Sequence, residues 1–186
     1  MKLIRMEKTG GGRYLKSYRL VYENKAGKEK NFEIVSHAEM SDPSELGSRV
    51  SGVSIVAYNG DRMLLLREFR MGANRYIYNL CAGMIEEGES VEDCVRRELY
   101  EETGLKLVRI IDALKPSFAA VALSDIRNRI IFAEVEGEIE SHASENEDIT
   151  AKLYTREEVA QLVENEEFSS RAQAIAYFFA KKGRVC

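Results

Sequence analysis

The stretch "GMIEEGESVEDCVRRELYEETGL", residues 83–105, places three glutamates close together near the end of a predicted helix. Ser90 followed by Asp93 has the spacing of a capping box, the pair of side chains that begins many helices. Gly104 is a natural residue to follow the last turn, because glycine readily takes the left-handed conformation found there. The pattern therefore predicts a helix over residues 91–103.

One face of this predicted helix carries both apolar and acidic side chains. At about 100° per residue, that face holds Val91, Cys94, Val95, Glu98, Glu101 and Glu102. Carboxylates three and four positions apart repel one another, and these also lie near the negative end of the helix dipole. A solvated acidic helix end is the simpler interpretation, but a solvated turn should face away from the apolar stripe. A divalent cation would turn each penalty into an attraction, and all-oxygen ligands select Mg²⁺, Mn²⁺ or Ca²⁺.

The composition of the 186-residue chain bounds the class of protein. With 45% hydrophobic and 31% charged residues, it has the composition of a folded soluble protein of one well-packed domain, with room for a small appended subdomain. A net charge of −4 without a clustered basic face argues against nucleic-acid binding. Three widely spaced cysteines and two histidines argue against a disulfide framework and a zinc site. There is no signal-peptide pattern and no apolar run of the ~20 residues that cross a bilayer, so we expect no membrane association and a cytoplasmic location.

Short β-type segments occur along much of the chain. Residues 13–35 predict a hairpin around the turn "NKAGKE", and residues 36–48 lose periodicity, which predicts a linker. Asn59-Gly60 is a strong hairpin signal between two further β-type runs. Three more segments predict strands: "RYIYNL" (75–80), "VRIIDAL" (108–114) and "NRIIFAEVEG" (128–137).

Two helices are predicted after these strands. "LYTREEVAQLVEN", residues 153–165, changes to helical spacing behind a capping box formed by Thr155 and Glu158. The helix predicted within residues 169–182 has one apolar face, made of Ala172, Ile175, Ala176 and Phe179. Strands interleaved with a few helices indicate a mixed sheet flanked by helices.

The acidic stretch resembles the Nudix box, G-x5-E-x7-R-E-U-x-E-E-x-G-U, in which U is an aliphatic residue. Every specified position is matched: Gly83, Glu89, Arg97, Glu98, Leu99, Glu101, Glu102, Gly104 and Leu105. The resemblance implies an α+β fold, the Nudix α/β/α sandwich with a mixed sheet. It also implies a loop-helix-loop that binds Mg²⁺, with Mn²⁺ as an alternative, and hydrolyses a nucleoside diphosphate linked to another moiety.

The resemblance also implies roles for individual residues. Glu98 and Glu102 match the principal metal ligands, with Glu101 nearby and the carbonyl of Ala82 as a further ligand. Four residues match those that support the site: Gly83, Glu89, Arg97 and Gly104. Within this set Arg97 and Glu89 resemble the pair that braces the helix and its loop, although a plain surface ion pair would have the same sequence.

Resemblance to the ADP-ribose pyrophosphatase branch of the family extends beyond the box. In "LLLREFRMGANRYIYNLCAGMIEEGES", Arg70 matches an arginine that contacts substrate, with a surface arginine at a strand end as the alternative. In "HASENEDITAKLYTREEVAQLVE", Glu145 is the candidate general base and Glu147 a further metal ligand, unless this acidic loop is merely solvated. Tyr14 occupies a region where such enzymes stack an aromatic ring on adenine, but a sheet-face tyrosine has the same pattern.

Some residues depart from that branch. Val121 stands where a proline is common, Cys81 replaces a proline before the Ala-Gly pair, and the linker lacks basic residues until Arg49 at its end. Resemblance implies a homodimer, with residues 1–47 as an N-terminal hairpin region and linker and residues 48–186 as the Nudix domain.

These features predict Mg²⁺-dependent hydrolysis of ADP-ribose or a related nucleoside diphosphate sugar to a nucleoside monophosphate and a sugar phosphate. A hydrolase for GDP-sugars or nucleoside triphosphates is an alternative with the same chemistry. A non-catalytic nucleotide-sugar sensor on the same fold is an alternative of another class.

Overall fold

The chain forms two compact units in a computed structural model that describes residues 1–140, 142 and 144–182. Unit 1 comprises Met1–Gly52 and Lys115–Arg129, and unit 2 comprises Val53–Leu114 and Ile130–Cys186. Residues 115–129 thus fold with the N-terminal strands, a long-range association that local sequence patterns do not signal. The division into regions at residue 47 stays a prediction.

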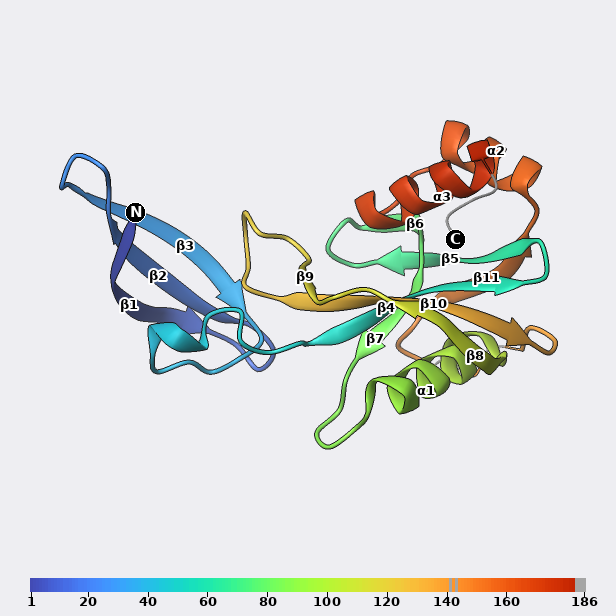
Figure 1. The fold of residues 1–186 in the computed structure, drawn as a ribbon, viewed down its shortest axis with the longest axis horizontal. Helices are drawn as coiled ribbons and strands as arrows, with labels where there is room; N and C mark the ends of the chain where they lie inside the picture. The colour runs from blue at the N-terminus through green and yellow to red at the C-terminus, as the bar shows by residue number, and fades with distance from the viewer. Residues whose placement is uncertain (141, 143, 183–186) are drawn as a thin grey trace. The chain divides into compact units, whose positions relative to one another are not determined.

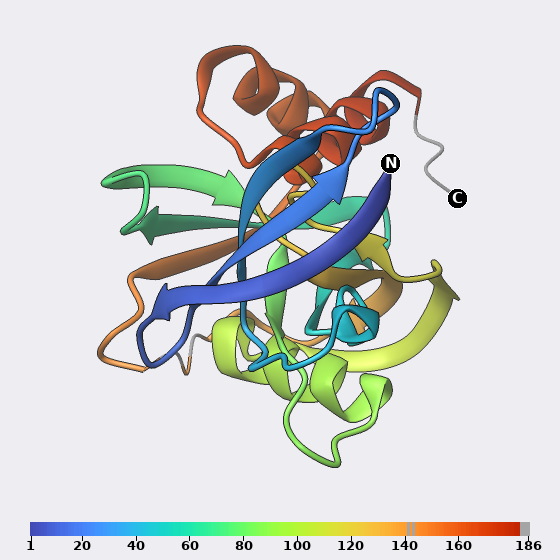
Figure 2. The same cartoon turned by 90° about the vertical axis from the view of Figure 1, so that its left-hand side faces the viewer.

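Unit 1 is built on a three-stranded antiparallel sheet, which Figure 2 shows as one twisted layer. Its strands are β1 (Lys2–Gly11), β2 (Lys16–Glu23) and β3 (Glu29–Ser36). The pairing of β2 with β3 confirms the predicted hairpin. Its turn is fixed by the side chain of Asn24, which accepts hydrogen bonds from the amides of Ala26 and Lys28. Strand β1 was not predicted, because its alternation of apolar and polar residues is weak.

The predicted linker is a packed segment of unit 1. It contains the short 3₁₀ helix η1 (Pro43–Glu45), which begins at Asp42 with a complete capping box. Met40 is buried beside Tyr18, Leu20 and Ile34 in the core of this unit. The Tyr18 hydroxyl holds the segment to the sheet, since it accepts from the Met40 amide at 2.7 Å and donates to the Ala38 carbonyl at 3.2 Å.

Unit 2 contains most of a larger mixed sheet, with the strand order β11-β5-β4-β10-β8. The strands are β4 (Gly52–Asn59), β5 (Arg62–Arg70), β6 (Arg75–Asn79), β7 (Cys81–Met84), β8 (Lys106–Ala113), β10 (Arg127–Glu136) and β11 (Ile149–Tyr154). The neighbours β4 and β10 run in the same direction (Figure 1), whereas β5 pairs antiparallel with β11 and β6. The short β9 (Ser117–Phe118) pairs with the first residues of β10 in unit 1. The tight turn at Gly60, which has a φ of 59°, confirms the hairpin predicted between β4 and β5.

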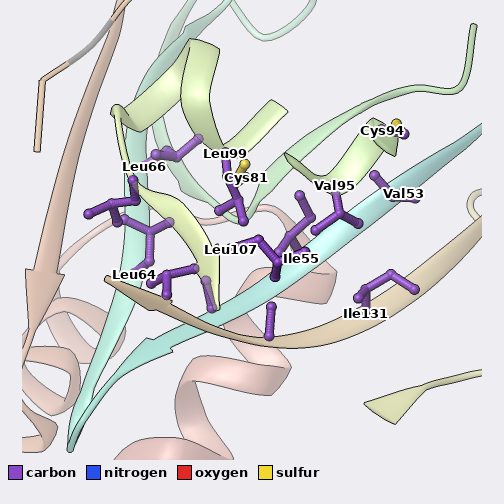
Figure 3. Packing of buried hydrophobic residues seen from close by; sticks show 14 residues of the cluster. Val53, Ile55, Leu64, Leu66, Cys81, Cys94, Val95, Leu99, Leu107 and Ile131 are labelled. Carbon is purple, nitrogen blue, oxygen red and sulfur yellow. The ribbon is translucent and has the colours of Figure 1, made fainter. Parts of the chain in front are cut away.

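Helices cover both faces of the unit 2 sheet, with α1 (Val91–Thr103) on one side and α2 (Arg156–Asn165) and α3 (Ser170–Lys182) on the other (Figure 1). The alternation of side chains along each strand divides the core. Val53 and Ile55 pack with Val95 and Leu99 of α1 (Figure 3), whereas Val56, the residue after Ile55, packs with the residues of α2 and α3. The α/β/α sandwich is therefore confirmed. So is the apolar face of α3, where Ala172, Ala176 and Phe179 are buried and Ile175 is partly buried.

None of the helices in the described part of the chain is both long enough and apolar enough to span a membrane.

The first prediction concerns the Tyr18 hydroxyl. Tyr18→Phe leaves the buried Met40 amide and the Ala38 carbonyl without this partner, so it should lower the free energy of unfolding of unit 1 by roughly 1–3 kcal/mol. Hydrogen exchange of the Met40 amide and urea denaturation would measure the change. Tyr22→Phe is a matched control, because the Tyr22 hydroxyl has no hydrogen-bond partner among the described residues. Equal effects of the two variants would contradict this role of Tyr18.

Candidate functional site

Helix α1 carries most of the candidate site and has the predicted bounds, Val91–Thr103. The Ser90 hydroxyl accepts from the Asp93 amide at 3.1 Å and donates to the Asp93 carboxylate at 2.6 Å. The predicted capping box is therefore only half formed, because the short aspartate side chain bonds the hydroxyl instead of reaching the Ser90 amide. The helix ends at Gly104, which has a φ of 72°. A β-carbon at Gly104 would lie 2.3 Å from the Glu140 carbonyl oxygen, so the close approach of that segment also requires glycine.

Two of the three clustered glutamates point into the protein. The buried residues of α1 are Cys94, Val95, Glu98, Leu99, Glu102 and Thr103. Glu98 and Glu102 are 9% and 7% exposed, but the Glu101 side chain is 50% exposed. The prediction of three inward carboxylates is therefore wrong for Glu101. Because Leu99 and Thr103 belong to the buried face, its centre lies about 50° from Glu98, and Glu101 is about 110° away from that centre.

The Glu98 carboxylate packs directly against the backbone of Gly83 on β7. A β-carbon at Gly83 would lie 1.7 Å from Glu98 Oε1, so only glycine admits the carboxylate at this position. Burial raises the pKa of Glu98, and the guanidinium of Arg97 opposes this shift. Arg97 Nη1 donates to Glu98 Oε1 at 2.7 Å.

Arg97 also joins the helix to the loop that precedes it. Its Nε and Nη2 donate to the two oxygens of Glu89 at 2.9 and 3.0 Å, and Nη2 donates to the Met84 carbonyl at 2.9 Å. Glu89 in turn accepts from the Glu86 amide at 2.9 Å. The guanidinium lowers the pKa of Glu89 to about 2, with help from that amide. A bidentate ion pair of this kind restrains both side chains, so it fixes the position of the loop relative to the start of the helix.

Glu102 is a buried carboxylate whose charge is poorly compensated. It accepts from the Ala82 amide at 3.2 Å, and no basic side chain in the described part of the chain pairs with it. Burial raises the pKa of Glu102 to about 8; the Cys81 thiol, as a hydrogen-bond donor, lowers it, and the negative charge of Glu98 raises it further. An ionised carboxylate in this position would be stabilised by a cation.

A cavity of about 220 Å³ brings several predicted site residues together in unit 2. Arg70, Ala82, Glu102 and Glu147 all line it. The described residues that line the cavity do not include Glu98, Glu101 or Glu145. Tyr14 belongs to unit 1, on the loop between β1 and β2, where it is 69% exposed.

Sequence reasoning missed other residues that line the same cavity: Glu68, Phe69, Met71, Asn79, Leu80, Asn146, Asp148 and Ile149. One signal could have identified Glu68. It follows Leu64 and Leu66 at the strand period of two, so it continues an apolar face of β5 with a charge.

The acidic loop before β11 is held at both ends. On one side the amides of Glu140 and His142 donate to the carbonyls of Thr103 and Glu101, the last residues of α1. On the other side Asp148 accepts from the Phe69 amide through its carbonyl at 2.9 Å and from the Tyr76 hydroxyl through its carboxylate. These contacts fix the loop ends between the helix and the cavity.

The two loop glutamates differ in their contacts. The Glu147 carboxylate accepts from the amide and hydroxyl of Ser144 at 3.2 and 3.1 Å. Glu145 is exposed. Both Ser144 contacts involve Glu147 Oε2, which leaves Glu147 Oε1 without a Ser144 contact, whereas Glu145 is open to solvent.

The oxygen donors around Gly83 fit a hard divalent cation. Across residues 1–140, 142 and 144–182, no three His, Cys, Asp or Glu side chains lie together in an arrangement that could hold a metal ion. However, Glu102 is buried without a cation, Glu98 is buried with only Arg97, and the Ala82 carbonyl group belongs to a cavity-lining residue. Mg²⁺ and Mn²⁺ prefer carboxylate and carbonyl oxygens, so the donor chemistry matches.

Comparisons with known proteins identify the family of the chain. A family model described as "NUDIX domain" matches residues 48–178. The ADP-ribose pyrophosphatase of Escherichia coli (strain K12) is 36% identical over 128 residues, which cover 62% of this chain and 59% of that protein. The "ADP compounds hydrolase NudE" of the same organism is 26% identical over 130 residues, or 70% of this chain and 69% of that protein. The matched region thus spans about three fifths of the length of the ADP-ribose pyrophosphatases.

A solved structure supports the fold. The "Crystal structure of ADP compounds hydrolase" superposes with a TM-score of 0.71 over 99% of this chain and 96% of that one, at 22% sequence identity.

The second prediction concerns the contact between Gly83 and Glu98. Gly83→Ala should displace the Glu98 carboxylate, because the new β-carbon would overlap it, and so weaken divalent-ion binding by about tenfold or more. Isothermal titration calorimetry with Mn²⁺ would measure this. Gly72→Ala is the control, since a β-carbon there meets nothing within 4 Å. A folded Gly83→Ala protein that binds Mn²⁺ like the wild type would contradict the predicted role of Glu98.

The third prediction concerns the buried charge of Glu102 in metal-free protein. Its folded pKa of about 8 exceeds the ordinary 4.5, so between these pH values the folded state holds a proton that the unfolded state has lost. Stability should therefore fall as pH rises from about 5 to 8, by roughly 2–4 kcal/mol from this group. Glu102→Gln should remove that part of the fall and be more stable than the wild type at pH 8.

Thermal and urea unfolding from pH 5 to 8, in buffer with a chelator that removes divalent ions, would measure the free energy of unfolding and test this prediction. Glu101→Gln is the control, because that side chain is half exposed. Parallel stability profiles for the wild type and Glu102→Gln would show that the buried charge carries no such penalty.

Proposed function

Because the chain belongs to the Nudix family, we propose that it hydrolyses a nucleoside diphosphate linked to another moiety. ADP-ribose or a related nucleoside diphosphate sugar is the proposed substrate, giving a nucleoside monophosphate and a sugar phosphate. The observation that carries this proposal is the cavity on which the buried Glu102 and the basic Arg70 both lie. The name of the E. coli relative, an ADP-ribose pyrophosphatase, supports the substrate class.

Mg²⁺ is the proposed cofactor, with Mn²⁺ as an alternative. Glu98, Glu102 and the carbonyl of Ala82 would hold it, with Glu101 and Glu147 as further ligands. A bound divalent ion supplies charge neutralisation for the diphosphate and lowers the pKa of a water. Burial of Glu98 and Glu102 supports this role, because it restrains both carboxylates. Glu102 also has no basic side chain beside it in the described chain, so a metal ion would be the cation that compensates its charge.

Glu145 is the proposed general base. Its carboxylate is exposed, three residues before Asp148, where the loop is bonded to Phe69 and Tyr76. The carboxylate would take the proton of the attacking water once loop and substrate bring the two within hydrogen-bond reach. Glu147 lies between these two acidic residues and faces the cavity.

Arg70 and Tyr14 are the proposed substrate contacts. Arg70 is the only basic side chain that lines the cavity among the described residues, so it would contact the diphosphate. Tyr14 presents an exposed ring that could stack on adenine. Both roles come from the family resemblance together with these positions.

We also propose a cytoplasmic homodimer that forms through residues 1–47, without nucleic-acid or membrane partners. Several large apolar side chains in this range are exposed, which supports an interface there: Met1, Ile4, Tyr14, Leu15 and Phe32.

The fourth prediction is the activity itself. Purified protein with Mg²⁺ should convert ADP-ribose to AMP and ribose phosphate faster than it cleaves GDP-mannose or ATP, measured by chromatography of the products. Glu102→Gln should lower kcat on the order of a hundredfold or more at saturating Mg²⁺, because a ligand of the catalytic ion is lost. The Gly72→Ala variant should retain wild-type turnover.

The same assays distinguish the alternative substrates and the non-catalytic sensor from the proposed function. Preferred cleavage of GDP-mannose or ATP would replace the proposed substrate with one of the other nucleotides. Tight binding of ADP-ribose without cleavage in Mg²⁺ or Mn²⁺ would support a sensor instead of an enzyme. Undiminished turnover by Glu102→Gln would remove the proposed metal role of that residue.

A further inference from the structure

A third buried carboxylate, Glu68, lies on the cavity but outside the Nudix box. It is 7% exposed and comes from β5, two residues before Arg70. Strand alternation places its side chain on the face that Leu64 and Leu66 share with α1. An anionic group in such a position costs free energy unless hydrogen bonds compensate it.

Both oxygens of Glu68 have donors from the same part of unit 2. Oε1 accepts from Asn79 Nδ2 at 2.7 Å, and Oε2 accepts from Arg70 Nη1 at 3.3 Å. Asn79 Oδ1 in turn accepts from the Ser169 hydroxyl at 2.6 Å. A continuous chain of polar contacts therefore runs from Ser169 through Asn79 and Glu68 to Arg70.

The far end of this chain is firmly anchored. The Ser169 amide donates to the Tyr78 carbonyl at 3.0 Å, and the Tyr78 amide donates to the Glu167 carbonyl at 2.7 Å. These backbone bonds tie the residues before α3 to β6. The Ser169 hydroxyl thus has a fixed position, from which it orients the Asn79 amide with its NH₂ group toward Glu68.

The near end, at Arg70, is exposed to solvent. The Arg70 side chain is 57% exposed, and an ion pair this exposed contributes little to stability. Its guanidinium keeps further N–H groups available for an anionic ligand while one is bonded to Glu68. An arginine held in place before a ligand arrives loses less conformational freedom on binding it.

We infer that Ser169, Asn79 and Glu68 are positioning residues that hold the Arg70 guanidinium over the cavity, where it meets the diphosphate of the substrate. The inference rests on the proposed function for the identity of the ligand. The three residues act through Arg70, and Ser169 does not line the cavity within the described chain. Their contribution through Arg70 is to binding of the substrate.

The experiment breaks the chain at Ser169 and at Asn79 and compares each effect with and without Arg70. Ser169→Ala and Asn79→Ala leave every charge intact, so they separate positioning from electrostatics. Glu68 itself is left unchanged, because its negative charge also raises the pKa of Glu102. Each variant should raise KM for ADP-ribose by about threefold to tenfold, as expected for one lost hydrogen bond, with kcat within about twofold of the wild type.

In an Arg70→Ala background the same two substitutions should leave KM within about twofold of the KM of Arg70→Ala alone, because the guanidinium that they position is absent. Ser169→Thr retains a hydroxyl and should recover most of the loss. The Ser169 hydroxyl also accepts from the Ala172 amide at 3.4 Å, at the start of α3. Thr155→Ala is the matched control for this loss of helix capping, since the Thr155 side chain accepts from the Glu158 amide at the start of α2. Equal KM increases with and without Arg70, or unchanged KM in folded Ser169→Ala and Asn79→Ala, would overturn the inference.

A ligand-free measurement separates this inference from the proposed function. The ¹⁵N heteronuclear NOE of Arg70 Nε should fall in Ser169→Ala and Asn79→Ala but not in Thr155→Ala. If the wild type cleaves no nucleotide, the proposed function fails, and this NOE still decides whether Arg70 is held. An unchanged NOE in both variants would reject the positioning chain.

Discussion

Burial of two carboxylates on the inward face of α1 is the constraint on which the rest of the site depends. Glu98 and Glu102 occupy places that would otherwise continue the apolar stripe of Cys94, Val95 and Leu99. Their exposure to water there is small, and Glu102 has no basic partner in the described chain. The apolar core between α1 and the sheet has to offset that cost. A protein would retain such an arrangement where a captured cation restores the balance.

The surrounding structure is organised to keep these carboxylates in position. Gly83 leaves room for Glu98, and Arg97 and Glu89 fix the loop before the helix. The amides of Glu140 and His142 satisfy carbonyls at the end of the helix. Other residues of unit 2 that line the cavity are Arg70 on β5 and residues of the acidic loop before β11. Each is tied to the sheet by hydrogen bonds at named positions. The site therefore combines hydrogen-bonded loop ends with a few exposed side chains, Arg70 and Glu145 among them.

Local patterns predicted the elements whose residues interact close together in sequence. The bounds of α1, the capping box at Thr155, the hairpin at Gly60 and the apolar face of α3 all follow from spacing alone. Patterns failed where distant segments decide the outcome. They did not predict β1, the packing of Met40 from the supposed linker, or the association of residues 115–129 with unit 1.

The candidate site shows the same division. The Nudix box identified the residues of α1, but helical angles measured from Glu98 placed Glu101 inward, because Leu99 and Thr103 were not counted in the buried face. Glu68, Asn79 and Ser169 carry no motif, since their relation exists only after β5, β6 and the start of α3 have packed together. Long-range polar contacts of this kind require the folded structure.

Anomalous diffraction from crystals of the protein soaked in Mn²⁺ tests the central claim most directly. If the buried pair exists to hold a cation, a strong peak should lie within about 2.5 Å of carboxylate oxygens of Glu98 and Glu102. Peaks confined to exposed carboxylates, with Glu98 and Glu102 still bonded only to Arg97 and the Ala82 amide, would contradict it.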